Sequence, residues 1–462
     1  MSKIHIGRGS IVVEDPEDII LDELRWFRRD ENGVGQYENI YTISENNGHK
    51  TLVTMPGFAD RLVKISNGEG VCDERMPMPK PDLVAAARGL HECWFDVVGK
   101  AVKNCGGIVA IPEILGCVNM AAAILRAFPM ERLLERGTAT SLVVAKNREE
   151  ARAIAFALRK VMPERDVGLL TPGTHTDSDD IIVTSYGAMK DMSCWAVGVL
   201  IACNLEDCEI MPWVEELSAV RNAARWGIYT SASGGGFVSD VAIEGIFGNA
   251  IAQATYADAT KSGCAEPIMV CWLPAPPPIN GVGYGNFRLV EAQAIQNNPV
   301  FCQMVAEIME RTPSSMGCVC CTELKAVTAK IAAAIRNGVS FEVLRKRIDP
   351  KLRRIARDNI TSGNACRAII SYDAPLNMTP QSVMIVATCK GGDLVMKRLP
   401  WKVSSDDNGR AYIVDFKHQW DFHNGRPGFV AINDESRRNM YKEFGFRQMY
   451  LNNIDQLPFL NG

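Results

Sequence analysis

Residues 106–128, GGIVAIPEILGCVNMAAAILRAF, place a short apolar strand directly before a helix. Residues 108–111 form a continuous apolar run, and Pro112 ends it. From Val118 onward the apolar positions follow helical spacing. An apolar strand followed by a helix is the repeating unit of a parallel sheet that helices cover on both faces. The stretch therefore predicts an α/β fold.

The same alternation continues on both sides of this stretch. Residues 81–103 have helical spacing, and an apolar strand at 140–146 precedes a strongly amphipathic helix at 148–162. Further buried strands are predicted at 179–186, 196–204 and 225–233. A Pro- and Gly-rich stretch at 273–285 interrupts the pattern, which restarts with helices at 301–311 and 324–335 and strands at 317–321, 366–372, 382–389 and 411–416.

The first 80 residues have a different pattern. Residues 49–55 and 60–66 are short alternating runs between Gly and Asn turns, which predicts strands. We therefore expect three domains: a small, mostly β domain at 1–80, a first α/β domain at 83–272 and a second α/β domain at 286–462.

Composition limits the class of protein. The chain has 462 residues, of which 47% are hydrophobic and 23% charged, as in a soluble globular protein of two or three domains. No apolar run is long enough for a bilayer, and the N-terminus lacks the apolar core of a signal peptide, so we expect no membrane partner. The net charge is -4, but residues 301–462 carry about +7, which leaves about -11 on the rest.

The cysteines favour a reducing compartment. The 15 cysteines are spread through predicted strands and helices of a long chain, which indicates reduced thiols and a cytoplasmic location. The C-x-x-C of Cys318 and Cys321 lies in a predicted strand and has no second pair at zinc-finger spacing. We therefore expect no structural metal.

Over residues 83–425 the order and spacing of these segments resemble the superfamily 2 helicases, including DEAD/DEAH-like and phage helicases. The resemblance implies two tandem RecA-like domains and a phosphate loop after the first strand. At that place Gly116 replaces the lysine that neutralises phosphate, and Cys117 replaces the hydroxyl that binds Mg²⁺. Glu113 adds a carboxylate where a triphosphate would lie. The resemblance thus implies a degenerate nucleotide site.

Two further nucleotide elements of the family are altered. After the strand at 196–204 the family has neighbouring carboxylates for Mg²⁺ and water, whereas this sequence has Cys203 and Asn204, with Glu206 following late. The family's last motif supplies arginines, and Trp401 stands where one is typical. We expect no catalytic residue and no cofactor.

The resemblance implies nucleic-acid contacts at retained positions. Lys146 and Arg148 match the loop of the family's second motif, and Thr184 and Ser185 match a later strand end. The basic segment 345–357, with Arg345, Lys346 and Arg353, is interpreted equally well as a phosphate-binding patch or as a solvated helix face. Residues 418–428, with two histidines, fit no standard metal site and are predicted to form a surface turn.

Together these patterns favour a pseudo-helicase that keeps the fold without the ATPase and binds nucleic acid or protein subunits through the helicase scaffold. The alternative is a structural component of a phage or other large particle, which would place the chain in a virion. A divergent ATP-dependent helicase or translocase is the least favoured hypothesis.

Overall fold

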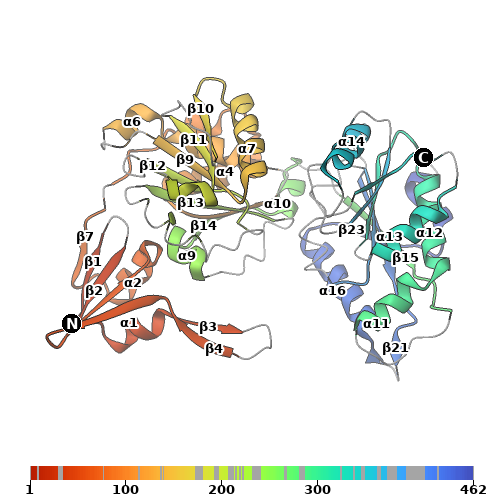
Figure 1. Cartoon of the computed structure of the whole chain (residues 1–462), viewed down its shortest axis with the longest axis horizontal. Helices are drawn as coiled ribbons and strands as arrows, with labels where there is room; N and C mark the ends of the chain where they lie inside the picture. Colours follow the sequence, from red (N-terminus) through yellow and green to blue (C-terminus); the bar gives the residue numbers. More distant parts are fainter. Residues whose placement is uncertain are drawn as a thin grey trace. The chain divides into compact units, whose positions relative to one another are not determined.

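A computed structural model of the chain divides into two compact units, Met1–Ala254 and Thr255–Gly462; Figure 1 shows the elements of each. The structure describes residues 2–7, 10–29, 35–75, 77–112, 115–135, 138, 140–171, 180–191, 197–205, 213, 216–217, 220, 223–231, 241–264, 268–279, 287–322, 325–336, 339–344, 349–361, 366–371, 382–391, 411–423 and 426–460. Among these residues, no helix is both long enough and apolar enough to cross a bilayer.

The N-terminal part of the first unit is a five-stranded sheet in the order β5-β6-β2-β1-β7. β1 pairs in parallel with β7 and antiparallel with β2, so the sheet is mixed. Apolar residues from one face of this sheet form a core with helices α1 and α2. The prediction of a small, mostly β domain is confirmed. Its elements are β1 (Lys3–Ile6), β2 (Ile11–Glu14), α1 (Asp18–Glu23), β3 (Arg25–Arg29), β4 (Gly35–Asn39), β5 (Tyr41–Asn46), β6 (His49–Thr54), η1 (Pro56–Phe58), α2 (Ala59–Ile65) and β7 (Val71–Asp73).

Two local predictions in this unit are wrong. Residues 60–66 are predicted as a strand, but all of them except the last, Ser66, belong to α2, where Ala59 and Leu62 are buried three positions apart. A short apolar run does not distinguish a strand from a helix turn. The helix expected at 81–103 is broken into α3 (Leu83–Ala87), η2 (Glu92–Trp94) and α4 (Phe95–Lys103). Gly89 has a φ of 75°, in the left-handed region that glycine tolerates, and interrupts the helix there.

The rest of the first unit is a seven-stranded sheet in the order β10-β11-β9-β12-β13-β8-β14. Every pairing is parallel. All residues of β8 and β12 are buried, as their continuous apolar sequences predict. The strands are β8 (Gly107–Pro112), β9 (Thr140–Ala145), β10 (Val167–Leu170), β11 (Ile181–Ser185), β12 (Val197–Ala202), β13 (Ala224–Ser231) and β14 (Ala250–Gln253). The remaining helices are α5 (Cys117–Ala127), α6 (Met130–Leu134), α7 (Arg148–Val161), η3 (Tyr186–Asp191) and α9 (Val241–Phe247).

The second unit contains another parallel seven-stranded sheet, in the order β17-β18-β16-β19-β20-β15-β23. Its strands are β15 (Ile268–Pro274), β16 (Cys318–Thr322), β17 (Glu342–Leu344), β18 (Arg367–Ser371), β19 (Val383–Ala387), β20 (Ala411–Lys417) and β23 (Arg447–Tyr450), with a hairpin of β21 (Phe422–His423) and β22 (Arg426–Pro427). Its helices are α10 (Tyr256–Lys261), α11 (Phe287–Glu291), η6 (Ala292–Gln296), α12 (Pro299–Arg311), α13 (Lys325–Ala334), α14 (Pro350–Thr361), α16 (Phe429–Glu443), η7 (Ile454–Gln456) and η8 (Pro458–Leu460). The fold is a small N-terminal domain followed along the chain by two parallel-sheet α/β domains.

The second unit begins earlier than the sequence predicts. Strand β15 (Ile268–Pro274) lies between β20 and β23 of the second sheet, whereas the expected boundary leaves residues up to 272 in the first domain. The proline-rich stretch after β15 is therefore not the division between domains. The stretch instead continues directly from β15, which is the first strand of the second sheet along the chain and ends at Pro274. The backbone N–H of Ala275 still donates a hydrogen bond to the carbonyl oxygen of Lys417.

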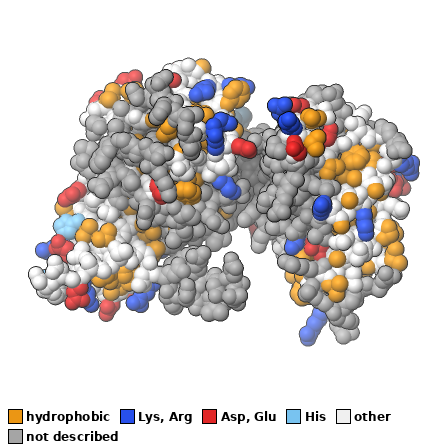
Figure 2. All heavy atoms as spheres, viewed as in Figure 1, with side chains coloured by type: hydrophobic (Ala, Val, Ile, Leu, Met, Phe, Trp, Pro, Cys, Tyr) orange, Lys and Arg blue, Asp and Glu red, His pale blue; other side chains and the backbone are white. Residues whose placement is uncertain are grey.

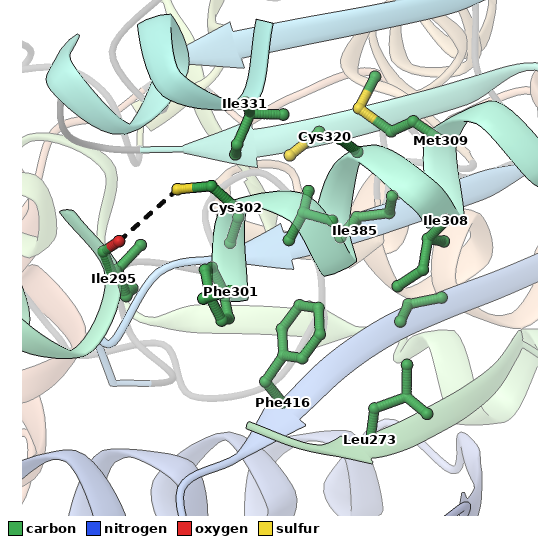
Figure 3. Packing of buried hydrophobic residues seen from close by; sticks show 14 of the residues in the cluster. Leu273, Ile295, Phe301, Cys302, Ile308, Met309, Cys320, Ile331, Ile385 and Phe416 are labelled. Atoms are coloured by element: carbon green, nitrogen blue, oxygen red, sulfur yellow. Dashed lines mark hydrogen bonds between the residues drawn. The ribbon is translucent and has the colours of Figure 1, made fainter. Parts of the chain in front are cut away.

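Aliphatic side chains, together with aromatic and sulfur-containing ones, fill the core of the second unit (Figure 3). Phe301 of α12 packs edge-on against Phe416 of β20, with ring centroids 4.8 Å apart. The thiol of Cys302 lies 3.7 Å from the carbonyl oxygen of Ile295. Cys318 and Cys321 both lie in β16, as predicted, and are fully buried. Burial raises the pKa of the Cys318 thiol to about 12, so it stays protonated and packs as a small apolar group.

The N-terminal domain contacts α9 of the first sheet domain through the short helix η1. The contact is so close that a Cβ added to Gly57 would lie 2.0 Å from the carbonyl oxygen of Glu244 and 2.7 Å from that of Gly245. Next to it, Met55 packs against the core of the N-terminal sheet and against the core beside α9. The two parts of this unit therefore share a backbone-to-backbone contact that only glycine permits at this position.

Candidate functional site

The carboxyl ends of five neighbouring strands meet along one edge of the first sheet. The strand register aligns Ser185 with Ala145, and Ser231 with Pro112. Ala202, the last residue of β12, aligns with β9 on one side and β13 on the other. Ligands of parallel α/β sheets bind at this edge, which makes it the first candidate site.

At the place of a phosphate loop, the chain turns back on its own strand. The backbone N–H groups of Leu115 and Gly116 donate to the carbonyl oxygen of Pro112, at 3.0 and 3.5 Å. The side-chain amide of Asn119 donates to the carbonyl oxygen of Leu115 at 2.7 Å. Cys117, the first residue of α5, is buried. Phosphate loops bind anions through outward-facing N–H groups, whereas two of these N–H groups already bond within the turn.

The residues after β12 form a polar link across the strand ends. Cys203 is fully buried, and Asn204 has a φ of 53°, a conformation that asparagine tolerates. The Asn204 side chain accepts a hydrogen bond from the Thr230 hydroxyl at 2.9 Å and donates one to the Glu150 carboxylate. Asn204 therefore connects β12, β13 and α7 at the position where the resemblance implied a metal-binding acid.

Glu150 supplies the carboxylate of this link and also forms hydrogen bonds at the start of α7. Asn147 caps the helix, accepting from the Glu150 backbone N–H at 3.0 Å, and the Glu150 carboxylate accepts the Lys146 backbone N–H at 3.0 Å. An acid near a helix N-terminus is stabilised by the helix dipole. Sequence reasoning missed Glu150, although Asn147 and Glu150 have the spacing typical of a capping pair.

Restoring an acid at Asn204 should weaken this domain. In Asn204→Asp the side chain no longer donates to Glu150, and two carboxylates face each other, so we expect a loss of about 1–3 kcal/mol in the free energy of unfolding. Urea denaturation measures it. The double variant Asn204→Asp/Glu150→Gln should recover most of the loss, because the amide introduced on α7 would donate to the new carboxylate. An unchanged stability in the single variant would contradict the proposed link.

The predicted nucleic-acid residues of the first domain meet at the same edge but differ in exposure. Lys146 and Arg148 are exposed at the start of α7. Thr184 and Ser185 lie beside them in β11 but are buried, and the Thr184 hydroxyl lies 3.5 Å from the carbonyl oxygen of Ser185. Of these four residues, the two cations are therefore the ones open to a partner. Several other predicted residues, Glu113, Glu206, Arg345, Lys346 and Trp401, lie outside the described residues; Arg353 lies in α14, but its side chain is not described.

A second polar cluster lies at the carboxyl end of β20 in the second unit, and sequence reasoning did not predict it. The Arg437 guanidinium is fully buried and forms ion pairs with Asp415 at 2.9 Å and Asp434 at 2.8 Å. Asp434 also lies 3.1 Å from the His418 ring, and the Tyr441 hydroxyl donates to Asp415 at 2.8 Å. The described side chains form one continuous buried network.

The prediction of a surface turn at 418–428 is wrong for its first residues. His418 and Asp421 are each 1% exposed. The Asp421 carboxylate accepts the backbone N–H groups of Val430 and Ala431, at 2.8 and 3.2 Å, and so caps the N-terminus of α16. These two hydrogen bonds hold Asp421 against the start of α16, whereas Arg426 and Pro427, further along the segment, are exposed.

Electrostatics identify Arg437 as the charge that holds the cluster together. Burial raises the pKa of the Asp415 carboxyl above its ordinary value, although Arg437 opposes the shift. Burial alone would also raise the pKa of Asp434, but His418 and Arg437 outweigh it and hold that pKa below its ordinary value. Burial disfavours the charged form of Arg437, but the two carboxylates outweigh it and raise its pKa, so Arg437 stays charged.

A thiol completes a Cys–His–Asp arrangement beside this cluster. The Cys389 sulfur lies 3.8 Å from Nε2 of His418, whose Nδ1 faces Asp434. A nucleophile needs a thiolate that a substrate can reach. Cys389 is fully buried, and burial raises its pKa well above the ordinary value. The arrangement therefore packs the core rather than performing catalysis.

Comparison with known proteins gives matches among solved structures, and these concern the fold. No family model and no curated protein matches the sequence. Among solved structures, Saccharomyces cerevisiae Dbp5 bound to Gle1 and IP6 is 10% identical, with a TM-score of 0.54, over 84% of this chain and 97% of that one. A single-substitution variant of Dbp5 bound to RNA and ADP BeF3 is also 10% identical, with a TM-score of 0.50, over 80% of this chain and 96% of that one.

The DUF1998 helicase MrfA bound to DNA and AMPPNP has a TM-score of 0.53 and 10% identity, over 84% of this chain and 56% of that one. At such identities the likeness concerns the fold alone. The chain has a helicase-like fold with two RecA-like domains in tandem along the sequence, as the sequence predicted.

Proposed function

We propose that the chain is a helicase-like scaffold without ATPase activity that binds nucleic acid or a protein partner. The main support is the turn after β8, where the Pro112 carbonyl takes up the N–H groups of Leu115 and Gly116. Asn204 adds to it, because an amide bonded to Glu150 and Thr230 is a poor Mg²⁺ ligand compared with a free carboxylate. Both features support the proposal, because groups at the expected nucleotide site are already held in internal hydrogen bonds.

Nucleic-acid binding is the partner class that the carboxyl edge of the first sheet favours. Lys146 and Arg148 are exposed there beside strand ends, and exposed cations are what phosphate contacts require. Among proteins with a similar fold, two Dbp5 structures contain RNA and the MrfA structure contains DNA. The chain would keep this contact while lacking the step that powers movement.

Titration calorimetry with ATP and Mg²⁺ tests the nucleotide half of the proposal. We expect no saturable binding tighter than about 1 mM and no hydrolysis above the buffer rate. Micromolar binding, or hydrolysis that disappears in Glu206→Gln, would overturn it.

A labelled single-stranded oligonucleotide at low salt tests the other half. The plot of the logarithm of the binding constant against the logarithm of salt concentration has a negative slope. In Lys146→Gln/Arg148→Gln this slope should become less steep by roughly 1.4, because two phosphate contacts are lost. Lys100→Gln/Lys103→Gln, two exposed lysines of α4, should leave the slope unchanged. Equal slopes in both variants would exclude contact at the sheet edge.

A further inference from the structure

Helix α14 is attached to the second unit along one side. Ala356 is buried, and the Asn359 amide donates to Glu342 of the edge strand β17 at 2.6 Å. Asp349 caps the helix by accepting the Lys351 backbone N–H at 2.7 Å. These contacts fix which face of α14 is turned away from the sheet.

The outward face combines aliphatic and basic side chains. Leu352 is 56% exposed and Ile355 is 52% exposed. Residues three apart lie side by side on a helix, so the two form one small apolar surface. Lys351 and Arg354 are exposed next to them. In Figure 2 basic and apolar side chains lie together, with acidic ones beside them, where Figure 1 places α14.

The charge of the whole segment is strongly positive. Residues 345–358, RKRIDPKLRRIARD, contain seven basic residues and two acids. One of those acids, Asp349, is already bonded to the first turn of the helix. The other acid, Asp358, is exposed one turn after Arg354. The excess of positive charge in the segment favours a partner that carries negative charge, and that partner must also bury two aliphatic side chains.

We propose that this face, defined by Lys351, Leu352, Arg354 and Ile355, docks an acidic amphipathic helix of a protein partner. Apolar side chains spaced three or four apart on the partner pack on Leu352 and Ile355, and its carboxylates pair with Lys351 and Arg354. The inference deepens the proposed function by naming a protein partner. It depends on the chain acting as a binding scaffold but not on the fate of ATP.

Nucleic acid explains only half of the face. A phosphate backbone pairs with lysine and arginine, but its charged oxygens gain nothing from aliphatic side chains that are more than half exposed. Large exposed apolar groups beside polar ones are typical of protein contacts. The aliphatic pair thus separates the two partner classes, and it is the pair to mutate.

The test uses the full chain and three fluorescent probes in anisotropy titrations. The first is a short acidic peptide with leucines on one helical face, the second has the same composition in scrambled order, and the third is a single-stranded oligonucleotide. Wild type should bind the first peptide saturably and at least about 10-fold more tightly than the scrambled one. Leu352→Ser/Ile355→Ser should weaken the first peptide by about 10-fold or more and leave the oligonucleotide unchanged.

Two further variants complete the design. Lys351→Gln/Arg354→Gln should weaken the ordered peptide and reduce its salt dependence. Phe156→Ser removes another exposed apolar group, 59% exposed on α7, and should change nothing. Equal binding of ordered and scrambled peptides, or no effect of the serine double variant, overturns the docking site. Oligonucleotide binding that depends on Lys351 and Arg354 alone would assign the face to nucleic acid instead, while ATP binding would contradict only the proposed function.

Discussion

Replacing Arg437 with methionine should destabilise the second unit by about 3–5 kcal/mol, the usual cost of removing one partner from a buried ion pair. Arg437 is fully buried and bonds to Asp415, to Asp434 and to the carbonyl oxygen of Lys390. Methionine keeps an unbranched apolar side chain in place of the aliphatic part of arginine, so it leaves a smaller cavity than alanine would. It leaves two buried carboxylates without their cation, and the desolvation cost of those groups then falls on the folded state.

The neighbouring Arg438 gives a matched control. It lies on the same helix and pairs with Glu435, but its side chain is 46% exposed. Arg438→Met should therefore change the free energy of unfolding by less than about 1 kcal/mol. Guanidinium denaturation, followed by circular dichroism, measures both variants. If Arg437→Met lowers the free energy of unfolding as little as Arg438→Met does, the buried network adds little to the stability of this unit.

The same network shows where sequence reasoning reaches its limit. Strands such as β8 and β12 could be predicted, because a continuous run of apolar residues indicates burial on both faces of the sheet. His418 and Asp421 do not lie in such an apolar run, and their polar side chains resemble those of a surface turn. Their burial depends on partners far along the chain, since Asp421 caps α16 and His418 faces Asp434. Such pairing follows from tertiary structure, which periodicity does not encode.

At the candidate nucleotide site, too, some features could be predicted from the sequence and others could not. Gly116 and Cys117 stand where the resemblance implies a lysine and a hydroxyl, and this difference could be read directly from the sequence. The hydrogen bonds formed at this sheet edge could not be predicted from the sequence, because the bond from Asn204 to Glu150 joins residues 54 positions apart. The capping pair of Asn147 and Glu150 was readable as a local pattern, but its role at the sheet edge required the strand order.

Gly57→Ala should have the largest effect on the N-terminal domain, about 3 kcal/mol or more, because the added methyl overlaps backbone rather than a flexible side chain. Its Cβ would lie 2.0 Å from the carbonyl oxygen of Glu244 and 2.7 Å from the backbone nitrogen of Gly248. Neither atom can move without shifting α9 or the turn behind it. We expect the N-terminal domain to leave α9, with faster proteolysis in the segment at 75–82.

Gly99→Ala is the matched control for this substitution. Gly99 lies inside α4, and a Cβ there meets nothing within 4 Å. Alanine should stabilise that helix by roughly 0.5–1 kcal/mol, so the two glycine-to-alanine changes should move unfolding in opposite directions. Urea denaturation combined with limited proteolysis separates them. If Gly57→Ala unfolds like wild type and resists protease equally, the close contact at η1 is not what holds the N-terminal domain on α9.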